Sequence, residues 1–285
     1  MAAFNSEKDK LNLRYMGFCG ADDSTQPELM QLLSTHFPWI EWGVLFRPDK
    51  EGEARYATQD WVERLVAYNE DTGQMMRLAA HLCEARCQEV LHGDATFVKQ
   101  LLTWGFARVQ INATAANGVE VLAGKHAWYT ANVLKVVQEV PGIEFILQTN
   151  EETKPIYDPI ATSKTPPSNI SLLFDASCGK GVQIRSFPAP PQDPVIRCGY
   201  AGGIGPSTIR EVLEGIQKGQ QEQAQKQNRP ADPVWIDMES SLRLLQRTSK
   251  DGPESDVFSI ERCFQCILAA REFGMPVSNF SFLSI

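Results

Sequence analysis

Short apolar runs alternate along this chain with longer stretches in which apolar residues recur every three or four positions. The short runs predict eight strands, at residues 13–18, 42–46, 77–82, 108–111, 144–148, 171–174, 195–199 and 234–236. The longer stretches predict six helices, at residues 27–36, 59–69, 95–104, 127–139, 207–218 and 260–273. Strands that alternate with helices in this way are typical of a parallel sheet covered by helices.

Two α/β architectures fit this alternation, and the position of one turn distinguishes them. A doubly wound sheet usually carries its glycine-rich turn after the first strand. Here the turn Ala201-Gly202-Gly203 follows the seventh predicted strand, and barrels commonly bind phosphate with the loops after strands seven and eight. Eight strands also suffice to close a barrel of about 250 residues. The sequence therefore predicts an α/β protein with a single (β/α)8 TIM barrel over residues 1–285.

Some segments do not follow the alternation. Residues 1–10 are expected to form an N-terminal extension. Residues 150–169 are rich in Pro, Thr and Ser, and residues 179–193 run into the proline-rich sequence PAPPQDP, which predicts long loops in place of the fifth and sixth helices. Residues 219–233 are polar and Gln-rich, so they are expected to form a solvated extension of the seventh helix and a mobile linker, inserted before the eighth strand.

Composition narrows the class of protein. The formal net charge of −8 argues against a nucleic-acid partner, which would require a basic face. No run of eighteen apolar residues occurs, so neither a transmembrane helix nor a membrane partner is expected. The first residues lack the apolar stretch of a secretory signal. The seven cysteines, an odd number, fit a reducing compartment, and the sequence predicts a cytoplasmic protein.

Two close cysteine pairs raise the question of a zinc site. Cys83 and Cys87 lie four residues apart, and Cys263 and Cys266 lie three apart. The second pair falls on the apolar stripe of a predicted helix, where buried cysteine behaves as a small hydrophobic residue. Packing is therefore the favoured explanation, and no metal is expected.

Polar residues follow several of the predicted strands. In a barrel, residues just beyond the carboxyl ends of the strands face one shared mouth. The candidates are Cys19, Arg55, Gln110, Asp175, Gly202, Gly203 and the segment 237–241, which contains Asp237, Ser240 and Ser241. Each has an ordinary structural explanation as well, such as a turn capped by Asp175 or a solvated loop charge at Arg55. Their convergence on one mouth would instead create a pocket with acid, thiol and arginine groups.

The glycines of the seventh turn suggest what this pocket binds. Gly202 and Gly203 leave the backbone N–H groups open to an anion, because no Cβ stands in the way. The helix predicted after them adds a partial positive charge of about half a unit at its N-terminus. A phosphate group fits such a turn, although a Gly-Gly turn before a helix is also common chain geometry.

Several of these segments resemble phosphoribosylanthranilate isomerase, a (β/α)8 enzyme of tryptophan biosynthesis. The similar motifs are MGFCG with Cys19, GVLFRPDKEGEARYAT with Arg55, Val109-Gln110, LLFDASCGKG with Asp175, the turn Ala201–Gly203, and Asp237 in the eighth strand. Their order is that of the family. The resemblance extends from about residue 11 to about residue 273, which is nearly the whole chain.

The resemblance implies an Amadori rearrangement, in which a phosphoribosylamine is converted to a 1-deoxyribulose phosphate by an aldose–ketose isomerase. It implies that Cys19 is the general base, that Asp175 is the general acid, and that Arg55 holds the carboxylate of the substrate. The implied substrate-binding residues are Arg55, Gln110, Gly202, Gly203, Asp237, Ser240 and Ser241. It also implies a phosphorylated small-molecule substrate, no cofactor, and a monomer or homodimer.

The chain departs from the family pattern at two places. Ile111, Asn112 and Ala113 stand where the family has Leu-His-Gly after the fourth strand. The sequence MESSLR replaces the two serines and glycine of the phosphate loop, so that either Glu239, which brings a carboxylate, or Leu242 enters the loop, depending on a one-residue shift. Two alternatives therefore stay open: a divergent phosphate-binding barrel with a different substrate, and a catalytically silent barrel used as an interaction module.

Overall fold

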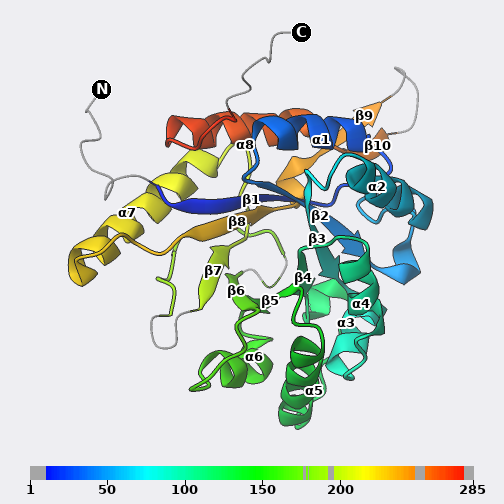
Figure 1. Cartoon of the computed structure of the whole chain (residues 1–285), viewed down its shortest axis with the longest axis vertical. Helices are drawn as coiled ribbons and strands as arrows, with labels where there is room; N and C mark the ends of the chain where they lie inside the picture. The colour runs from blue at the N-terminus through cyan, green and yellow to red at the C-terminus, as the bar shows by residue number, and fades with distance from the viewer. Residues whose placement is uncertain (1–10, 176–177, 179, 192–195, 248–253, 279–285) are drawn as a thin grey trace.

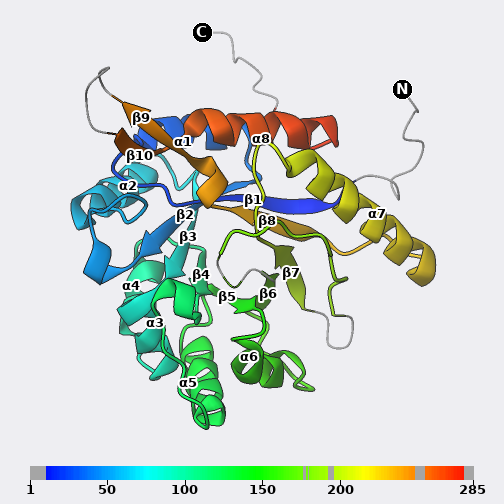
Figure 2. The same ribbon diagram turned by 180° about the vertical axis from the view of Figure 1, so that it is seen from behind.

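Eight parallel strands form a closed barrel in the structure, a computed structural model that describes residues 11–175, 178, 180–191, 196–247 and 254–278 (Figures 1 and 2). The strands are β1 (Leu13–Cys19), β2 (Ile40–Phe46), β3 (Arg77–Leu82), β4 (Arg108–Ile111), β5 (Glu144–Thr149), β6 (Ile170–Phe174), β7 (Arg197–Tyr200) and β8 (Val234–Met238). Each pairs with the next in chain order, and β8 pairs with β1. The predicted (β/α)8 barrel is confirmed.

Helices surround this barrel. They are α1 (Pro27–His36), α2 (Gln59–Asp71), α3 (Glu84–Leu91), α4 (Thr96–Thr103), α5 (His126–Glu139), α6 (Lys154–Ala161), α7 (Ile209–Gln227) and α8 (Ile260–Glu272). Both views show α1 and α8 side by side (Figures 1 and 2). The main core lies between the strands and the helices, where residues such as Trp42, Leu65 and Ile267 are buried.

Two helices were not expected from the sequence. Helix α3 precedes α4, so the β3–β4 connection holds two helices where only residues 95–104 were predicted to be helical. Helix α6 forms within residues 150–169, so the prediction of a long loop there is wrong. Pro155 lies in the first turn, where its missing N–H costs nothing, and the buried face of Ile156, Tyr157 and Ile160 outweighs the effect of Pro159. Residues 180–191, in contrast, form no helix, as predicted.

Helix α7 confirms the predicted extension but not its full solvation. The helix continues to Gln227, and Asn228 follows it in the left-handed conformation. Gln220 is buried, and its Nε2 donates hydrogen bonds to the backbone oxygens of Asn12 and Asp232. The Gln-rich stretch therefore packs one face against the start of β1 and the approach to β8.

A hairpin that the sequence did not predict follows β8. The short 3₁₀ helix η4 (Ser240–Leu242) leads into β9 (Arg243–Arg247), which pairs antiparallel with β10 (Glu254–Phe258). The buried guanidinium of Arg243 donates to Asp22, Asp256 and the backbone oxygen of Gly20. These bonds fix the hairpin beside the carboxyl end of β1.

The inside of the barrel contains a layer of buried charge. Arg108 of β4 pairs with Glu41 of β2 at 2.8 Å and with Glu144 of β5 at 3.2 Å. Arg197 of β7 contacts the same Glu144 at 3.5 Å. The Arg108 guanidinium also lies 4.2 Å from the ring centre of Trp235. These buried side chains fill the barrel interior below the mouth, on the side away from the carboxyl ends of the strands.

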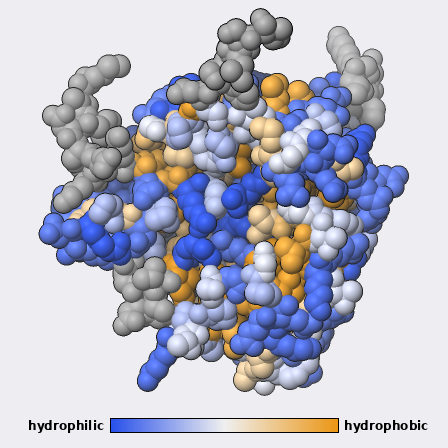
Figure 3. Space-filling model, viewed as in Figure 1, coloured by the Kyte–Doolittle hydropathy of each residue, from blue (hydrophilic) through white to orange (hydrophobic). Residues whose placement is uncertain are grey.

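The outer surface carries both hydrophilic and hydrophobic residues. Figure 3 shows one face that is mostly hydrophilic, with hydrophobic residues exposed between the polar ones. None of the helices in the described part of the chain combines the length and the apolar character needed to cross a bilayer.

Candidate active site

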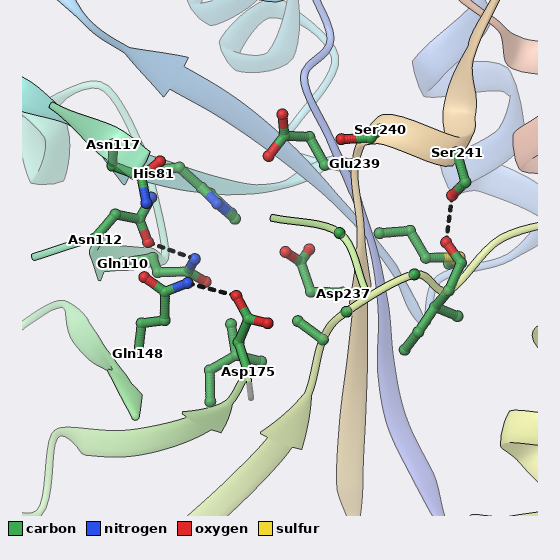
Figure 4. A pocket seen from close by; sticks show the side chains of 17 residues that line it. His81, Gln110, Asn112, Asn117, Gln148, Asp175, Asp237, Glu239, Ser240 and Ser241 are labelled. Carbon is green, nitrogen blue, oxygen red and sulfur yellow. Dashed lines mark hydrogen bonds between the residues drawn. The ribbon is translucent and has the colours of Figure 1, made fainter. Parts of the chain in front are cut away.

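A cavity of about 360 Å³ opens at the carboxyl ends of the strands (Figure 4). Its polar lining comes from strand ends and from the loops that follow them. These residues are His81, Gln110, Asn112, Asn117, Gln148, Asp175, Asp237, Glu239, Ser240 and Ser241. Backbone of the Gly202-Gly203 turn completes one wall. Strands that lie far apart in sequence thus contribute to one polar cavity.

Most residues that the sequence singled out lie at this cavity. Gln110, Asp175, Gly202, Gly203, Asp237, Ser240 and Ser241 line it. Cys19 ends β1 at the same mouth but lies fully buried, behind His81 and Asp237. Arg55 does not line the cavity, but its guanidinium contacts the lining residue Glu239.

Amide side chains order one side of the cavity. Gln148 donates from Nε2 to Oδ2 of Asp175 at 2.7 Å, which fixes the carboxylate. Gln110 donates from Nε2 to Asn112 Oδ1, also at 2.7 Å. The Oε1 atoms of Gln110 and Gln148 are buried and have no hydrogen-bond partner. Since buried acceptors without partners are costly, these two oxygens call for donors from a ligand or from water.

Cys19, His81 and Asp237 form a compact cluster on the floor of the mouth. The Cys19 sulfur lies 3.3 Å from His81 Nδ1, and the donor atoms of all three side chains lie within 4.8 Å of one another. Burial, followed by the charges of Asp237 and Glu239, raises the pKa of the Cys19 thiol well above its usual value. Burial and the nearby Arg108 lower the pKa of His81 to about 3. Cys19 and His81 are therefore neutral at physiological pH.

The carboxyl group of Asp237 also has a perturbed environment. Burial raises its pKa well above the usual range, and the neighbouring carboxylates of Glu41 and Glu239 raise it further. A carboxyl group in such surroundings holds its proton longer than one in water. Asp237 can thus act as a proton donor, or bind a cation that replaces the proton.

Arg55 and Glu239 form an ion pair at the rim. Arg55 Nη1 lies 2.8 Å from Glu239 Oε1, and the backbone N–H of Arg55 donates to Asp22. Arg55 has a φ of 71°, a left-handed conformation that non-glycine residues seldom adopt. Burial raises the pKa of Glu239, and Arg55 partly opposes that shift. The arginine expected to hold a substrate carboxylate is thus already bound to a carboxylate of the protein.

The Gly202-Gly203 turn needs its glycines for its backbone conformation and for close packing, whereas the binding of an anion by its N–H groups stays a prediction. Gly202 and Gly203 have φ values of 112° and 59°. A Cβ on Gly202 would lie 2.7 Å from the Val182 carbonyl oxygen, so the segment after β6 packs directly on this turn. Some of the expected anion donors are used internally. Gly205 donates its N–H to Thr208, and the Ser241 hydroxyl donates to the Ile204 carbonyl.

Sequence reasoning missed His81, Asn117 and Gln148 as cavity residues. One signal could have identified two of them: His81 pairs in register with Gln110, and Gln148 lies in the next strand two residues after Ile146, the register partner of Gln110. Both therefore occupy inward positions near the carboxyl end, as Gln110 does. The residues proposed from the sequence follow the other six strands, and none of them comes from the third or the fifth.

Comparisons with known proteins give little beyond the fold. No family model and no curated protein matches the chain. Among solved structures, the chain is similar to TrpF from Jonesia denitrificans, with 12% identity, a TM-score of 0.49, and coverage of 92% of this chain and 98% of that one. It is also similar to a chain of the tryptophan synthase complex from Pyrococcus furiosus, with 13% identity, a TM-score of 0.44, and coverage of 82% and 88%. A third similar structure is a GH113 β-1,4-mannanase, with 8% identity, a TM-score of 0.41, and coverage of 92% of this chain and 84% of that one. These values are too low to bear on activity.

Proposed function

We propose that this protein is an aldose–ketose isomerase of the phosphoribosylanthranilate isomerase type, which binds a phosphorylated, hydroxyl-rich sugar at the barrel mouth. The reaction needs a proton donor at the ring oxygen and a proton acceptor at the adjacent sugar carbon. Asp175 is the proposed donor. The acceptor belongs to the Cys19–His81–Asp237 cluster, in which the resemblance gives the base role to Cys19.

The arrangement around Asp175 supports this proposal most. Gln148 fixes one carboxylate oxygen, and Gln148 and Gln110 both line the cavity, with their Oε1 atoms buried and without a hydrogen-bond partner. Hydroxyl groups of a sugar are suitable donors for those two oxygens. The Gly202-Gly203 turn lines the same cavity, so a phosphate and a sugar ring can be held next to one acid.

The electrostatics of Cys19 qualifies its role. A cysteine acts as a base or nucleophile as the thiolate, which nearby positive charge stabilises. In this structure burial and two carboxylates raise the pKa of Cys19, so the resting protein carries a thiol. A base at this position therefore needs an additional positive charge close to the sulfur.

One observation favours a second candidate function, a divergent barrel that binds a different hydroxyl-rich ligand. Asp175, Asp237 and Glu239 all line the cavity, while none of its described lining residues is lysine or arginine. A carboxylate near a phosphate is unfavourable by about 1 kcal/mol or more at partly shielded distances. A neutral sugar would avoid that repulsion.

Ligand binding and turnover separate the two candidates. Thermal melts with ribose 5-phosphate and with ribose, each at about a hundredfold excess over Kd, should show stabilisation of about 2.7 kcal/mol for the ligand that binds. Turnover is followed by the consumption of phosphoribosylanthranilate. Asp175→Asn should lower the rate by about 10²–10⁴-fold. Asp158→Asn, on the outer helix α6, is the matched control and should leave the rate unchanged.

Stabilisation by ribose but not by its phosphate would favour the second candidate. A folded wild-type protein that responds to neither sugar and consumes no substrate would refute both, in favour of a silent barrel.

A further inference from the structure

We propose that Cys19, His81 and Asp237 form a binding site for a divalent transition metal of the zinc class, with a coordination position open to the cavity. The donors are one sulfur, one imidazole nitrogen and one carboxylate oxygen, all within 4.8 Å of one another. Three protein ligands with a vacant position are the usual set of a catalytic zinc site.

The barrel geometry explains how three separate strands bring these side chains together. Asp237 comes from β8 and Cys19 from the neighbouring β1, whereas His81 comes from β3, which is separated from β1 by β2. At the intervening position β2 carries Gly43, which pairs in register with Cys19. A Cβ there would lie 2.9 Å from both Cys19 Cβ and His81 Nε2. The glycine thus lets the imidazole reach the sulfur across a strand.

A second glycine makes room for the carboxylate. Gly17 pairs in register with Asp237, and a Cβ at this position would collide with Asp237 Oδ1. The two strand positions next to the cluster are therefore both glycine, and each leaves space that one of the donor side chains fills.

The distance between sulfur and imidazole nitrogen is already close to that around a tetrahedral ion. With a zinc–sulfur bond of about 2.3 Å and a zinc–nitrogen bond of about 2.0 Å, the two donor atoms lie about 3.5 Å apart. Cys19 Sγ and His81 Nδ1 are separated by 3.3 Å. Cys19 and His81 are buried, while His81 and Asp237 also line the cavity. The open side of the site therefore faces the space where a substrate binds.

Local charge also favours a cation. Asp175 and Glu239 line the same cavity as Asp237, so three carboxyl groups face it. Arg55 forms an ion pair with Glu239 at the rim. A divalent ion would replace protons on Cys19 and Asp237 and leave His81 neutral, which is the form that binds metals. If the proposed function also holds, the ion supplies the positive charge that the proton acceptor needs, because it acidifies a bound water. Cys19 is then a ligand and not itself the base.

Cobalt binding tests the site directly, without any sugar. The full chain is freed of metal with a chelator and titrated with Co²⁺, whose charge-transfer absorption reports a bound thiolate. We expect a single saturable site with the thiolate band, displaced by Zn²⁺. Cys19→Ser should abolish the band, whereas Asp237→Asn should keep it but weaken binding by about 10–100-fold. Cys83→Ser, a buried cysteine outside the cluster, is the matched control and should behave as wild type.

Circular dichroism and melting curves establish that each variant is folded. Absence of saturable binding in the folded wild type would overturn the proposal, and so would a thiolate band that survives Cys19→Ser or that Cys83→Ser removes. Failure of the proposed isomerase activity would leave this result unaffected, because the titration contains no substrate. If Cys19→Ser does not fold, Asp237→Asn with unchanged affinity would be equally decisive against the site.

Discussion

Replacing Arg108 with methionine should test whether the buried charge layer determines the stability of the barrel. Arg108→Met keeps an unbranched, though shorter, apolar side chain but removes the partner of Glu41, whose side chain is only 4% exposed. Glu144 loses the same guanidinium but retains Arg197. Breaking a buried pair from one side costs about 3–5 kcal/mol, because a charge is left without compensation. For a protein of this size that corresponds to a fall in melting temperature of at least about 6 °C.

The pH dependence of this loss identifies its cause. Burial already raises the pKa of Glu41, with Arg108 acting in the opposite direction, so the substitution should raise that pKa further. A carboxyl group with a raised pKa in the folded state binds more protons folded than unfolded. Proton binding by Glu41 therefore contributes most to the free energy of unfolding below the pKa of the unfolded chain, about 4.3. This contribution is lost as the pH rises through the higher pKa of Glu41 in the folded protein. The gap between variant and wild type should therefore be smaller at mildly acidic pH than at neutral pH.

Denaturant unfolding of a double-mutant cycle completes this test. Glu41→Gln in the Arg108→Met background should recover much of the lost stability, since the unpaired charge is then gone. The reasoning is refuted if Arg108→Met costs less than about 1 kcal/mol, the range of a surface ion pair. It is refuted equally if the second substitution brings no recovery.

Two further substitutions test the packing and the charge of the mouth. Gly199→Ala would place a Cβ into the Trp235 ring and should destabilise the protein by about 1–3 kcal/mol in thermal unfolding, whereas Gly219→Ala, which has open space in α7, should not be destabilising. Glu239→Gln releases Arg55 and should strengthen the binding of a phosphorylated sugar about fivefold in calorimetry, by about 1 kcal/mol. Unchanged affinity would mean that the bound anion does not approach position 239.

The order of elements could be predicted because it depends on local patterns. Apolar runs of three to six residues predicted all eight barrel strands close to their observed bounds, and α1 matches its predicted range. Helix α6 could not be predicted, since its two prolines oppose a helix locally and only the barrel supplies the surface that buries Ile156 and Ile160. The β9–β10 hairpin was missed for a similar reason: Arg243 anchors it to residues more than 200 positions away.

The site shows a comparable division. Residues that directly follow a strand, such as Asp175 and Gly202, could be assigned to the mouth from topology alone. The ion pair between Arg55 and Glu239 could not, because it joins two loops from opposite ends of the sequence. Neither could the contact between Cys19 and His81, which depends on the missing side chain at Gly43 and on the stagger of three strands.

The charge distribution inside the barrel links the two proposals. Below the mouth, Arg108 compensates Glu41 and part of Glu144, so this layer is balanced. At the mouth, Asp175, Asp237 and Glu239 face one cavity, and Arg55 is shared with Glu239 and with Asp256 of the hairpin, 4.0 Å away. Burial and neighbouring carboxylates raise the pKa of Asp237 and of Glu239, so these two groups hold their protons to higher pH unless a cation joins them. A phosphorylated sugar adds negative charge, so its binding and the binding of a divalent ion should strengthen each other. Without the ion, Asp237 must be protonated for a phosphorylated sugar to bind, because protonation removes one negative charge from the cavity.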